Sequence, residues 1–209
     1  MARYLVISLL RHGLTVENER KAYIGWTDSP LSLNGKRELE GKNYERLTPH
    51  LLFSSPLQRC VHTAKILFPD ERLHIIDELK EMNFGKWEGK TYDELKHRPA
   101  YRNWLNDIFT QPIEAGETFV QFSERITSGL QRVEKIAKKK EMNRITIITH
   151  GGVIRHILHT LYAKEKSFFD WEIPYGGGYE LTWPENELKE GDERCTLLAV
   201  VPTTVKQIG

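Results

Sequence analysis

The apolar stretch Tyr4-Leu5-Val6-Ile7-Ser8-Leu9-Leu10 leads directly into Arg11-His12-Gly13. Aliphatic and β-branched residues crowd this short window, which is typical of a buried β-strand. The strand therefore ends on a fixed cation, a titratable imidazole and a residue that permits close backbone approach. Because ligands of open α/β sheets bind outside the carboxyl ends of the strands, this tripeptide is a candidate site for a negatively charged substrate.

Strand and helix patterns alternate along the rest of the chain. Ser32 is a candidate N-cap, and Thr91 opens a capping box whose helix Pro99 is expected to end. The alternation predicts an α/β class with a mainly parallel sheet. A charged turn at 190–192 predicts that the last two strands pair as an antiparallel hairpin. The other helices are expected over 33–47, 57–68, 118–140 and 153–161, and the other strands over 51–53, 73–76, 144–149, 179–183 and 196–201.

Length and charge limit the possible functions. The 209 residues fit one domain over 1–209, in which 83–117 has no strand pattern and is expected to form a helical excursion covering the site. With 30 basic and 29 acidic residues the net charge is +1, which argues against nucleic acid or an anionic membrane as a partner. Cys60 and Cys195 belong to no metal-binding pattern. The scattered cysteines and the lack of a signal-peptide pattern lead us to expect a cytoplasmic protein.

Two further strand ends carry similar chemistry. The sequence Ser54-Ser55-Pro56-Leu57-Gln58-Arg59 puts Arg59 in the first turn of a helix, and His150-Gly151-Gly152 precedes another helix. Taken alone, Arg59 is typical of a surface residue and His150 of a hydrogen-bonded loop residue. If the three strands are neighbours, two arginines and two histidines converge on one small volume. A dianionic phosphoryl group is the natural ligand for such a cluster.

These junctions fall within five sequence blocks that follow the order of a known family. The blocks are Leu10-Arg11-His12-Gly13-Leu14-Thr15 with Asn18, Gly25-Trp26-Thr27-Asp28-Ser29-Pro30-Leu31-Ser32, 54–64 around Arg59, Glu81-Met82-Asn83-Phe84-Gly85-Lys86-Trp87-Glu88-Gly89, and Thr149-His150-Gly151-Gly152-Val153-Ile154-Arg155. Through these blocks the chain resembles the histidine phosphatase superfamily, in the branch that also holds cofactor-dependent phosphoglycerate mutases. The resemblance covers nearly the whole chain and implies a three-layer αβα sandwich with helices on both faces of the sheet.

The resemblance implies a role for each basic residue at the three strand ends. His12 is similar to the nucleophile that accepts the phosphoryl group and forms a phosphohistidine. Arg11, Arg59 and His150 resemble the groups that hold the phosphoryl oxygens, and Asn18 matches a residue that contacts the phosphate or leaving group. Positive side chains then supply the charge stabilisation that phosphoryl transfer needs, so we expect no metal and no cofactor.

The general acid is expected among three carboxylates that lie close together in the sequence. Glu81 resembles the acid that protonates the leaving oxygen and then serves the attacking water. General-acid catalysis requires a protonated carboxyl group within reach of that oxygen. Glu78 and Glu88 are near enough to remain alternatives.

Departures from the mutases favour a phosphatase. The excursion holds no arginine pair of the kind that mutases use for a substrate carboxylate, and Ile24 stands where mutases place a small hydroxyl residue. Ile24, Tyr23 and Trp26 would suit a hydrophobic, nucleoside-like leaving group. The order of the aromatic residues resembles the alpha-ribazole phosphatase group of cobalamin biosynthesis. The candidate substrate contacts are Thr15, Asn18, Tyr23, Ile24, Gly25, Trp26 and Gly151.

Three alternatives remain open. The chain could be a broad-specificity small-molecule phosphatase or a cofactor-dependent phosphoglycerate mutase. A catalytically silent phosphate-binding module is disfavoured, because degenerate relatives usually lose one of the two histidines and this chain keeps both His12 and His150. In each catalytic case the partner is a small phosphomonoester, and the protein is expected to be a monomer or a homodimer.

Overall fold

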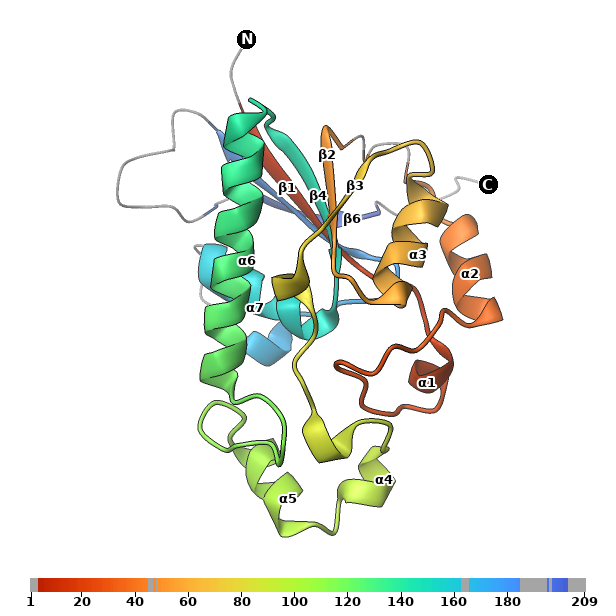
Figure 1. Ribbon diagram of the computed structural model, residues 1–209, viewed down its shortest axis with the longest axis vertical. Coiled ribbons are helices and arrows are strands. Elements are labelled where there is room, and N and C mark those ends of the chain that lie inside the picture. The colour runs from red at the N-terminus through yellow and green to blue at the C-terminus, as the bar shows by residue number, and fades with distance from the viewer. Residues whose placement is uncertain are drawn as a thin grey trace.

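The computed structural model describes residues 4–44, 47, 49–162, 166–184, 195 and 197–202. A six-stranded sheet runs through the molecule with helices on either side, and a smaller group of helices lies below it (Figure 1). The strands are β1 (Tyr4–Arg11), β2 (Leu51–Ser54), β3 (Leu73–Ile75), β4 (Arg144–Thr149), β5 (Gly178–Pro184) and β6 (Leu197–Val201). The helices are α1 (Val16–Glu19), α2 (Leu33–Glu40), α3 (Gln58–Leu67), α4 (Tyr92–Leu95), α5 (Pro99–Asn106), α6 (Phe119–Lys139), α7 (Gly151–Leu161) and the 3-10 turns η1 (Asp77–Leu79), η2 (Gly85–Trp87) and η3 (Phe168–Asp170).

The strand order β3-β2-β4-β1-β5-β6 brings the ends of three strands together. Strands β1 to β4 run parallel, whereas β5 and β6 are antiparallel to their neighbours. The register aligns Arg11 with Thr149 and Ser54 with Ile148, so β1, β4 and β2 end at one edge of the sheet. The predicted α/β fold and the C-terminal hairpin are confirmed. The predicted turn at 190–192 lies outside the described residues.

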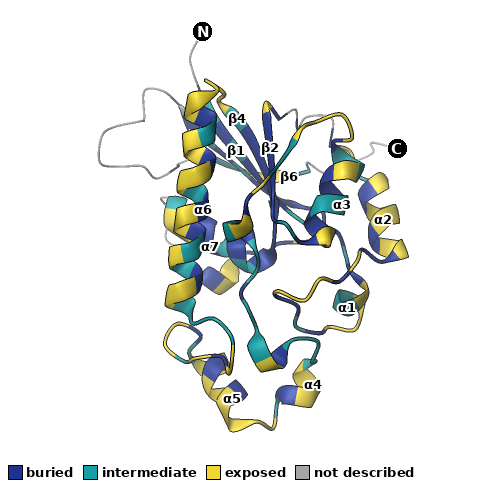
Figure 2. Ribbon diagram, in the orientation of Figure 1, coloured by how far each residue is buried: buried dark blue, intermediate teal, exposed yellow. Residues whose placement is uncertain are grey.

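Successive residues of the central strands point to opposite faces of the sheet, which produces two hydrophobic clusters. Leu9 and Ile147 belong to the cluster that contains the buried side chains of α6 and α7. Leu10 and Ile148 belong to the other cluster, together with Cys60 of α3. Figure 2 shows buried strands between helices whose outer surfaces are exposed. The sheet is therefore covered on both faces, which explains the continuous apolar runs of its strands.

Helix α6 forms where the sequence combines a strong cap with apolar residues at helical spacing. The hydroxyl of Thr118 accepts a hydrogen bond from the backbone N–H of Gln121 at 3.2 Å, and the Gln121 side chain accepts one from the Thr118 N–H at 2.9 Å. This reciprocal capping box fixes the first turn. Phe122, Ile126 and Val133 then lie on one buried face, as the spacing predicts.

The helical excursion projects beyond the carboxyl ends of the strands, at the bottom of Figure 1. The ring centroid of Trp87 lies 5.3 Å from those of both Tyr101 and Trp104, with the rings edge to face. Tyr23, from the loop after α1, joins this aromatic cluster through a 2.6 Å hydrogen bond between its hydroxyl and that of Tyr101. The excursion therefore has a small apolar core that it shares with the loop containing Tyr23.

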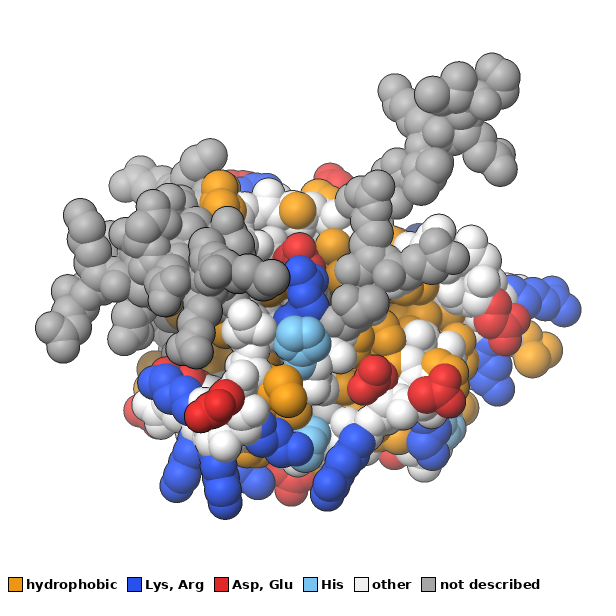
Figure 3. All heavy atoms as spheres, turned by 90° about the horizontal axis from the view of Figure 1, so that it is seen from above, with side chains coloured by type: hydrophobic (Ala, Val, Ile, Leu, Met, Phe, Trp, Pro, Cys, Tyr) orange, Lys and Arg blue, Asp and Glu red, His pale blue; other side chains and the backbone are white. Residues whose placement is uncertain are grey.

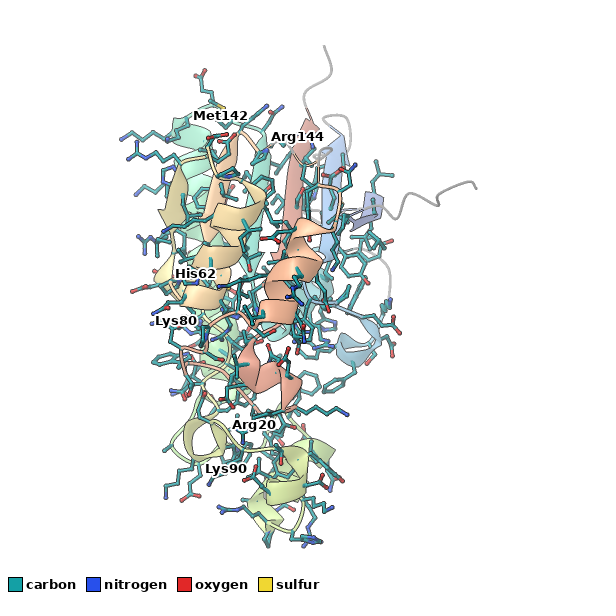
Figure 4. All side chains as sticks on the ribbon, turned by 90° about the vertical axis from the view of Figure 1, so that its right-hand side faces the viewer. Arg20, His62, Lys80, Lys90, Met142 and Arg144 are labelled. Atoms are coloured by element: carbon teal, nitrogen blue, oxygen red, sulfur yellow. The ribbon has the colours of Figure 1, made fainter. Side chains whose placement is uncertain are left out.

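Labelled residues mark the two ends of the molecule (Figure 4). Figure 4 places Met142 and Arg144, where the chain enters β4, at one end, and Arg20 and Lys90 toward the other end, which the excursion containing Lys90 forms. On the first of these ends, basic and acidic side chains are interspersed over the visible surface (Figure 3). Among the described residues no helix is both long enough and apolar enough to cross a membrane.

Three predicted boundaries are wrong, for local reasons. Ser32 caps α2 as expected, but the helix predicted over 33–47 ends at Glu40 because Gly41 forms its C-cap. Pro99 does not end the helix that follows Thr91, because α4 already ends at Leu95. Pro99 instead occupies the first turn of α5, where its missing N–H needs no partner. The helix predicted from 153 begins two residues earlier, at the start of α7.

Trp87 offers a test of the packing in the excursion. Its side chain is 1% exposed, so Trp87→Ala leaves a cavity between the rings of Tyr101 and Trp104. We expect the free energy of unfolding to fall by about 3–5 kcal/mol, measured by urea denaturation followed by circular dichroism. Val120→Ala is the control, since Val120 is 58% exposed and its replacement should change stability by less than about 0.5 kcal/mol. Equal stability of the two variants would contradict the assigned packing.

Candidate active site

Three strand ends form the floor of the candidate site. The backbone N–H of His12, after β1, donates to the carbonyl of Thr149 at 3.0 Å, and that of Ser55, after β2, donates to the carbonyl of Ile148 at 3.1 Å. The sheet register continues through these bonds for one residue beyond the strands. As a result, the imidazole rings of His12 and His150 lie edge to face with centroids 5.2 Å apart.

His12 is held as a neutral imidazole with a defined tautomer. Its side chain is 3% exposed, and Nδ1 lies 2.7 Å from the carbonyl oxygen of Gly13. A carbonyl can only accept, so Nδ1 carries the proton and Nε2 keeps a free lone pair. Burial, followed by the nearby charges of Arg59 and Arg11, holds the pKa of His12 well below its ordinary value. A neutral Nε2 is what nucleophilic attack on phosphorus requires.

Arg59 is a fully buried cation in the first turn of α3. It donates to the carbonyls of Gly25 at 2.6 Å and Thr27 at 2.8 Å, and through Nε to Nδ1 of His150 at 3.3 Å. A guanidinium has five N–H groups, so two remain for a ligand. Within the described part of the chain no carboxylate lies within ion-pair distance of Arg59. Burial lowers its pKa from the ordinary value, and the guanidinium remains charged.

The tautomer of His150 follows from its contact with Arg59. Because the Arg59 Nε–H donates to Nδ1, the imidazole proton lies on Nε2, which is 2.9 Å from the hydroxyl oxygen of Ser55. The His150 side chain is fully buried at the N-cap of α7. Burial and the charge of Arg59 lower its pKa well below the ordinary value. His150 is therefore a neutral hydrogen-bond donor beside His12.

Arg11 lies on the other side of His12 and is held by a residue that the sequence reasoning missed. One of its terminal N–H groups donates to the carbonyl of Ile173 at 2.7 Å, and its Cζ lies 3.8 Å from the ring centroid of Tyr175. The Nε of Arg11 is buried without a partner among the described residues. The glycine run after Tyr175 could have indicated that this segment lies against the end of β1, since the N–H of Gly176 reaches the carbonyls of both Arg11 and His12.

Thr15 and Asn18 occupy the loop that follows Gly13. The Thr15 side chain is fully buried, and its hydroxyl caps α1 by accepting from the Asn18 N–H at 3.2 Å. The side-chain oxygen of Asn18 is buried without a hydrogen-bond partner among the described residues. The structure thus gives Thr15 a capping contact, whereas Asn18 keeps an unused polar atom. The Gly13 N–H donates to the Thr63 hydroxyl at 3.0 Å, which fixes the start of this loop.

Glu81 reaches the same edge of the sheet from the segment after η1. One carboxylate oxygen accepts from the backbone N–H of Gly152 at 2.9 Å, and the other accepts from the N–H of Met82 at 3.0 Å. A Cβ at position 152 would lie 2.4 Å from this carboxylate, so Gly152 permits the contact. Burial lowers the pKa of Arg11 and that of Arg59, and the Glu81 carboxylate is close enough to both to oppose part of this lowering. It is therefore a carboxyl group beside the N-terminus of α7 and the two arginines.

The two alternative carboxylates have other partners. Glu88 accepts hydrogen bonds from four backbone N–H groups, which belong to Gly25, Trp26, Thr27 and Phe84. This cradle anchors the loop whose carbonyls hold Arg59. Glu78 instead pairs with Arg132 of α6 at 2.9 Å, near the surface. Of the three candidate acids, Glu81 is the one that lies against the N-terminus of α7.

The remaining predicted substrate contacts lie in different surroundings. Tyr23 and Ile24 are turned into the interior, with Ile24 7% exposed and the Tyr23 ring packed against Phe84 and Trp104. Trp26 is 41% exposed, and its indole N–H donates to the carbonyl of Glu81 at 2.9 Å. Trp26 is thus placed at the rim of the site, beside the candidate acid.

Gly25 allows a close approach at the site, because a Cβ there would overlap the carbonyl oxygen of Met82. At Gly151 a Cβ would lie 3.4 Å from Cζ of Arg11, which is an ordinary van der Waals contact. Of the two predicted glycine contacts, only Gly25 therefore depends on the lack of a side chain. Among the described residues no three histidine, cysteine, aspartate or glutamate side chains gather as ligands for a metal ion.

Comparison with known proteins agrees with this geometry. The sequence model of the histidine phosphatase superfamily (branch 1) matches residues 7–190. The chain is 30% identical over 159 residues to an adenosylcobalamin/alpha-ribazole phosphatase of Escherichia coli K12, covering 73% of this chain and 77% of that protein. It is 32% identical over 164 residues to phosphoglycerate mutase-like protein 4 of Arabidopsis thaliana, covering 74% and 70%.

Solved structures give the same answer for the fold. The crystal structure of the alpha-ribazole phosphatase from Shigella flexneri superimposes with a TM-score of 0.75 at 26% identity, covering 92% of this chain and 94% of that one. The five sequence blocks, the shared fold and the family match together show that the chain belongs to the histidine phosphatase superfamily.

Proposed function

We propose that this protein is a metal-independent phosphomonoester hydrolase that works through a phosphohistidine on Nε2 of His12. One observation carries the proposal: a buried, neutral imidazole whose Nδ1 proton is fixed by the carbonyl of Gly13, with Arg11 and Arg59 beside it. The imidazole is a ready nucleophile, and the two cations supply the charge that a phosphoryl dianion needs.

In the first step, Nε2 of His12 attacks phosphorus and forms a nitrogen–phosphorus bond. The bond between phosphorus and the ester oxygen breaks, its electron pair goes to that oxygen, and Glu81 supplies the proton that makes the leaving group an alcohol. In the second step, water attacks phosphorus, its proton returns to the Glu81 carboxylate, and the nitrogen–phosphorus bond breaks. Phosphate leaves and His12 is again neutral.

The remaining residues stabilise the charge on the phosphoryl oxygens. Arg59 has two N–H groups beyond those bound to protein, and Arg11 has a buried Nε–H without a partner in the described part of the chain. His150 donates its Nε2 proton to the Ser55 hydroxyl and accepts from Arg59 at Nδ1, so it holds the Arg59 guanidinium in place; we propose that it turns this donor to a phosphoryl oxygen when substrate binds. Charge-assisted hydrogen bonds of this kind act on phosphoryl transfer mainly by positioning and by electrostatic stabilisation.

We propose alpha-ribazole 5'-phosphate as the physiological substrate. Support comes from relatives that bear the name alpha-ribazole phosphatase and from the exposed indole of Trp26, on which a planar leaving group can stack. The likeness to a phosphoglycerate mutase-like protein keeps phosphoglycerate as the second candidate substrate, and a broad-specificity phosphatase remains the third.

The compartment and assembly belong to the proposal as well. Cys60 and Cys195 are both buried, and two scattered cysteines suit a reducing cytoplasm. We propose that the protein works there as a monomer or homodimer on a small phosphomonoester, without nucleic acid or membrane as partner.

The neutral histidines predict a pH-dependent stability in phosphate-free buffer. The pKa of His12 and that of His150 are lowered from the ordinary 6.5 in the folded state, so below that pH the unfolded chain binds protons that the folded chain does not. Stability should therefore fall on acidification, by about 1.4 kcal/mol per pH unit for each histidine. Urea unfolding between about pH 7 and about pH 5.5 measures this slope. His12→Gln should make it shallower, and His159→Gln, at the exposed end of α7, serves as the control; an unchanged slope in His12→Gln would contradict the assignment.

The covalent intermediate gives a direct test of the proposed chemistry. A phosphohistidine is labile in acid and stable in base, so rapid quenching into base during turnover of p-nitrophenyl phosphate should trap one phosphoryl group on His12. His12→Ala should lose the adduct and at least about 10³-fold in kcat/KM, whereas His62→Ala, outside the site, should retain both. Turnover should continue in EDTA. Full activity of His12→Ala, or loss of activity in EDTA, would contradict the mechanism.

Substrate choice is tested by a panel assayed under one set of conditions. We expect phosphate release from alpha-ribazole 5'-phosphate with a higher kcat/KM than from phosphoserine, 3-phosphoglycerate or sugar phosphates, because Trp26 favours a planar leaving group. Interconversion of phosphoglycerates is assayed in parallel with a bisphosphorylated primer. Efficient interconversion without phosphate release would overturn the hydrolase proposal in favour of a mutase, and equal rates across the panel would indicate broad specificity.

A further inference from the structure

Arg125 of α6 binds the backbone of the segment that carries the candidate acid, Glu81. Its guanidinium donates to the carbonyl of Glu78 at 2.7 Å, to that of Lys80 at 2.8 Å and to that of Glu81 at 3.1 Å. The carbonyl of Glu81 also accepts from the indole N–H of Trp26 at 2.9 Å. One side chain therefore contacts three of four successive peptide groups that end at Glu81.

Glu117, just before α6, completes the arrangement. Its carboxylate accepts from Nε and from a terminal N–H of Arg125, both at 2.7 Å, in a bidentate ion pair whose side chains are 16% and 13% exposed. The same carboxylate accepts from the backbone N–H of Asn83 at 2.9 Å. The segment is thus held on both sides of Glu81, by the guanidinium before it and by the carboxylate after it.

The segment needs such partners because it has little regular structure of its own. Beyond η1 it forms neither helix nor strand, and buried backbone groups without partners are costly. In the described part of the chain, the hydrogen bonds to the Glu81 carboxylate come from two backbone N–H groups, those of Met82 and Gly152. Its position against α7 therefore depends on where the backbone of residues 78–83 lies.

We propose that Arg125 is a positioning residue for the general acid Glu81. It acts through its bidentate ion pair with Glu117 and through its hydrogen bonds to three of the carbonyls of residues 78–81. It touches neither substrate nor the reacting atoms; it sets the distance between the Glu81 carboxyl group and the leaving oxygen. The inference rests on the proposed function, in which Glu81 protonates that oxygen. Lysine cannot replace it, because an ammonium group lacks the planar fork that reaches several acceptors at once.

The experiment compares two substrates that differ in their need for an acid. Benzyl phosphate and p-nitrophenyl phosphate have rings of similar size, but the alcohol must be protonated as it leaves, whereas the nitrophenolate leaves without a proton. The measured quantity is kcat/KM, which covers the steps through phosphoryl transfer to His12. Glu81→Gln calibrates the effect: its kcat/KM should fall about 10²–10⁴-fold with benzyl phosphate and far less with p-nitrophenyl phosphate.

Arg125→Lys should reproduce this selectivity in weaker form. We expect kcat/KM for benzyl phosphate to fall about 10–100-fold, as a misplacement of about 1 Å would cause, with less than about a threefold fall for p-nitrophenyl phosphate. Glu117→Gln removes the charged partner by a different change and should show the same selectivity. Arg132→Lys is the matched control, because Arg132 also lies on α6 and pairs with the side chain of Glu78 from an exposed position; it should leave both substrates unaffected.

The outcomes distinguish the positioning role of Arg125 from the acid role of Glu81. An equal loss on both substrates in Arg125→Lys and Glu117→Gln would indicate a general structural role and overturn the inference, as would no loss on either. If Arg125→Lys does not fold, as judged by circular dichroism, the result for Glu117→Gln decides. A Glu81→Gln variant without leaving-group selectivity would instead overturn the acid role of Glu81 in the proposed function.

Discussion

The guanidinium of Arg59 is fully buried and donates to the carbonyls of Gly25 and Thr27 and to the imidazole of His150. Removing a cation from water costs several kcal/mol, and a nearby carboxylate is the usual compensation. Among the residues that the structure describes, Arg59 has none within ion-pair distance. Backbone carbonyls therefore have to converge on it, which fixes the loop at 25–27 against α3 and the end of β4, and leaves a positive charge for an anionic ligand to neutralise.

The same physical device recurs around the site. Glu88 accepts hydrogen bonds from the N–H groups of the loop whose carbonyls bind Arg59. Arg125 donates to the carbonyls of the segment that ends at Glu81. Irregular backbone cannot pair its own N–H and C=O groups. A charged side chain with several donors or acceptors therefore supplies the hydrogen bonds that a helix or a sheet would otherwise provide. The backbone groups of these loops are thereby satisfied, although the loops contain little secondary structure.

The sequence predicted those parts of the molecule that depend on local or periodic signals. The strand before His12, the capping box at Thr91 and the apolar face of α6 can each be recognised from a short stretch of sequence. Arg125 gave no such signal, because it binds backbone far away in the chain and leaves no periodic trace. Tyr175 packs on the guanidinium of the distant Arg11, a contact that the glycine run after Tyr175 did not by itself indicate. Boundaries failed for a related reason: the single residue Gly41 ended a helix whose apolar pattern continues beyond it.

In the mechanism that we propose, one arrangement of charge serves both parts of the chemistry at His12. The fields of Arg59 and Arg11, added to burial, disfavour the imidazolium and so keep Nε2 unprotonated before substrate binds. The same fields attract the phosphoryl dianion, whose oxygens then neutralise them. As the nitrogen–phosphorus bond forms, positive charge develops on the ring, and by then it faces a phosphoryl group rather than two bare cations. The hydrogen bond from Nδ1 to the carbonyl of Gly13 strengthens in the same step, because its donor becomes charged. Before substrate binds, the charges of the two arginines disfavour a protonated His12. Once the phosphoryl group neutralises them, they no longer disfavour the positive charge on a phosphorylated His12, so the transition state is stabilised relative to the free enzyme.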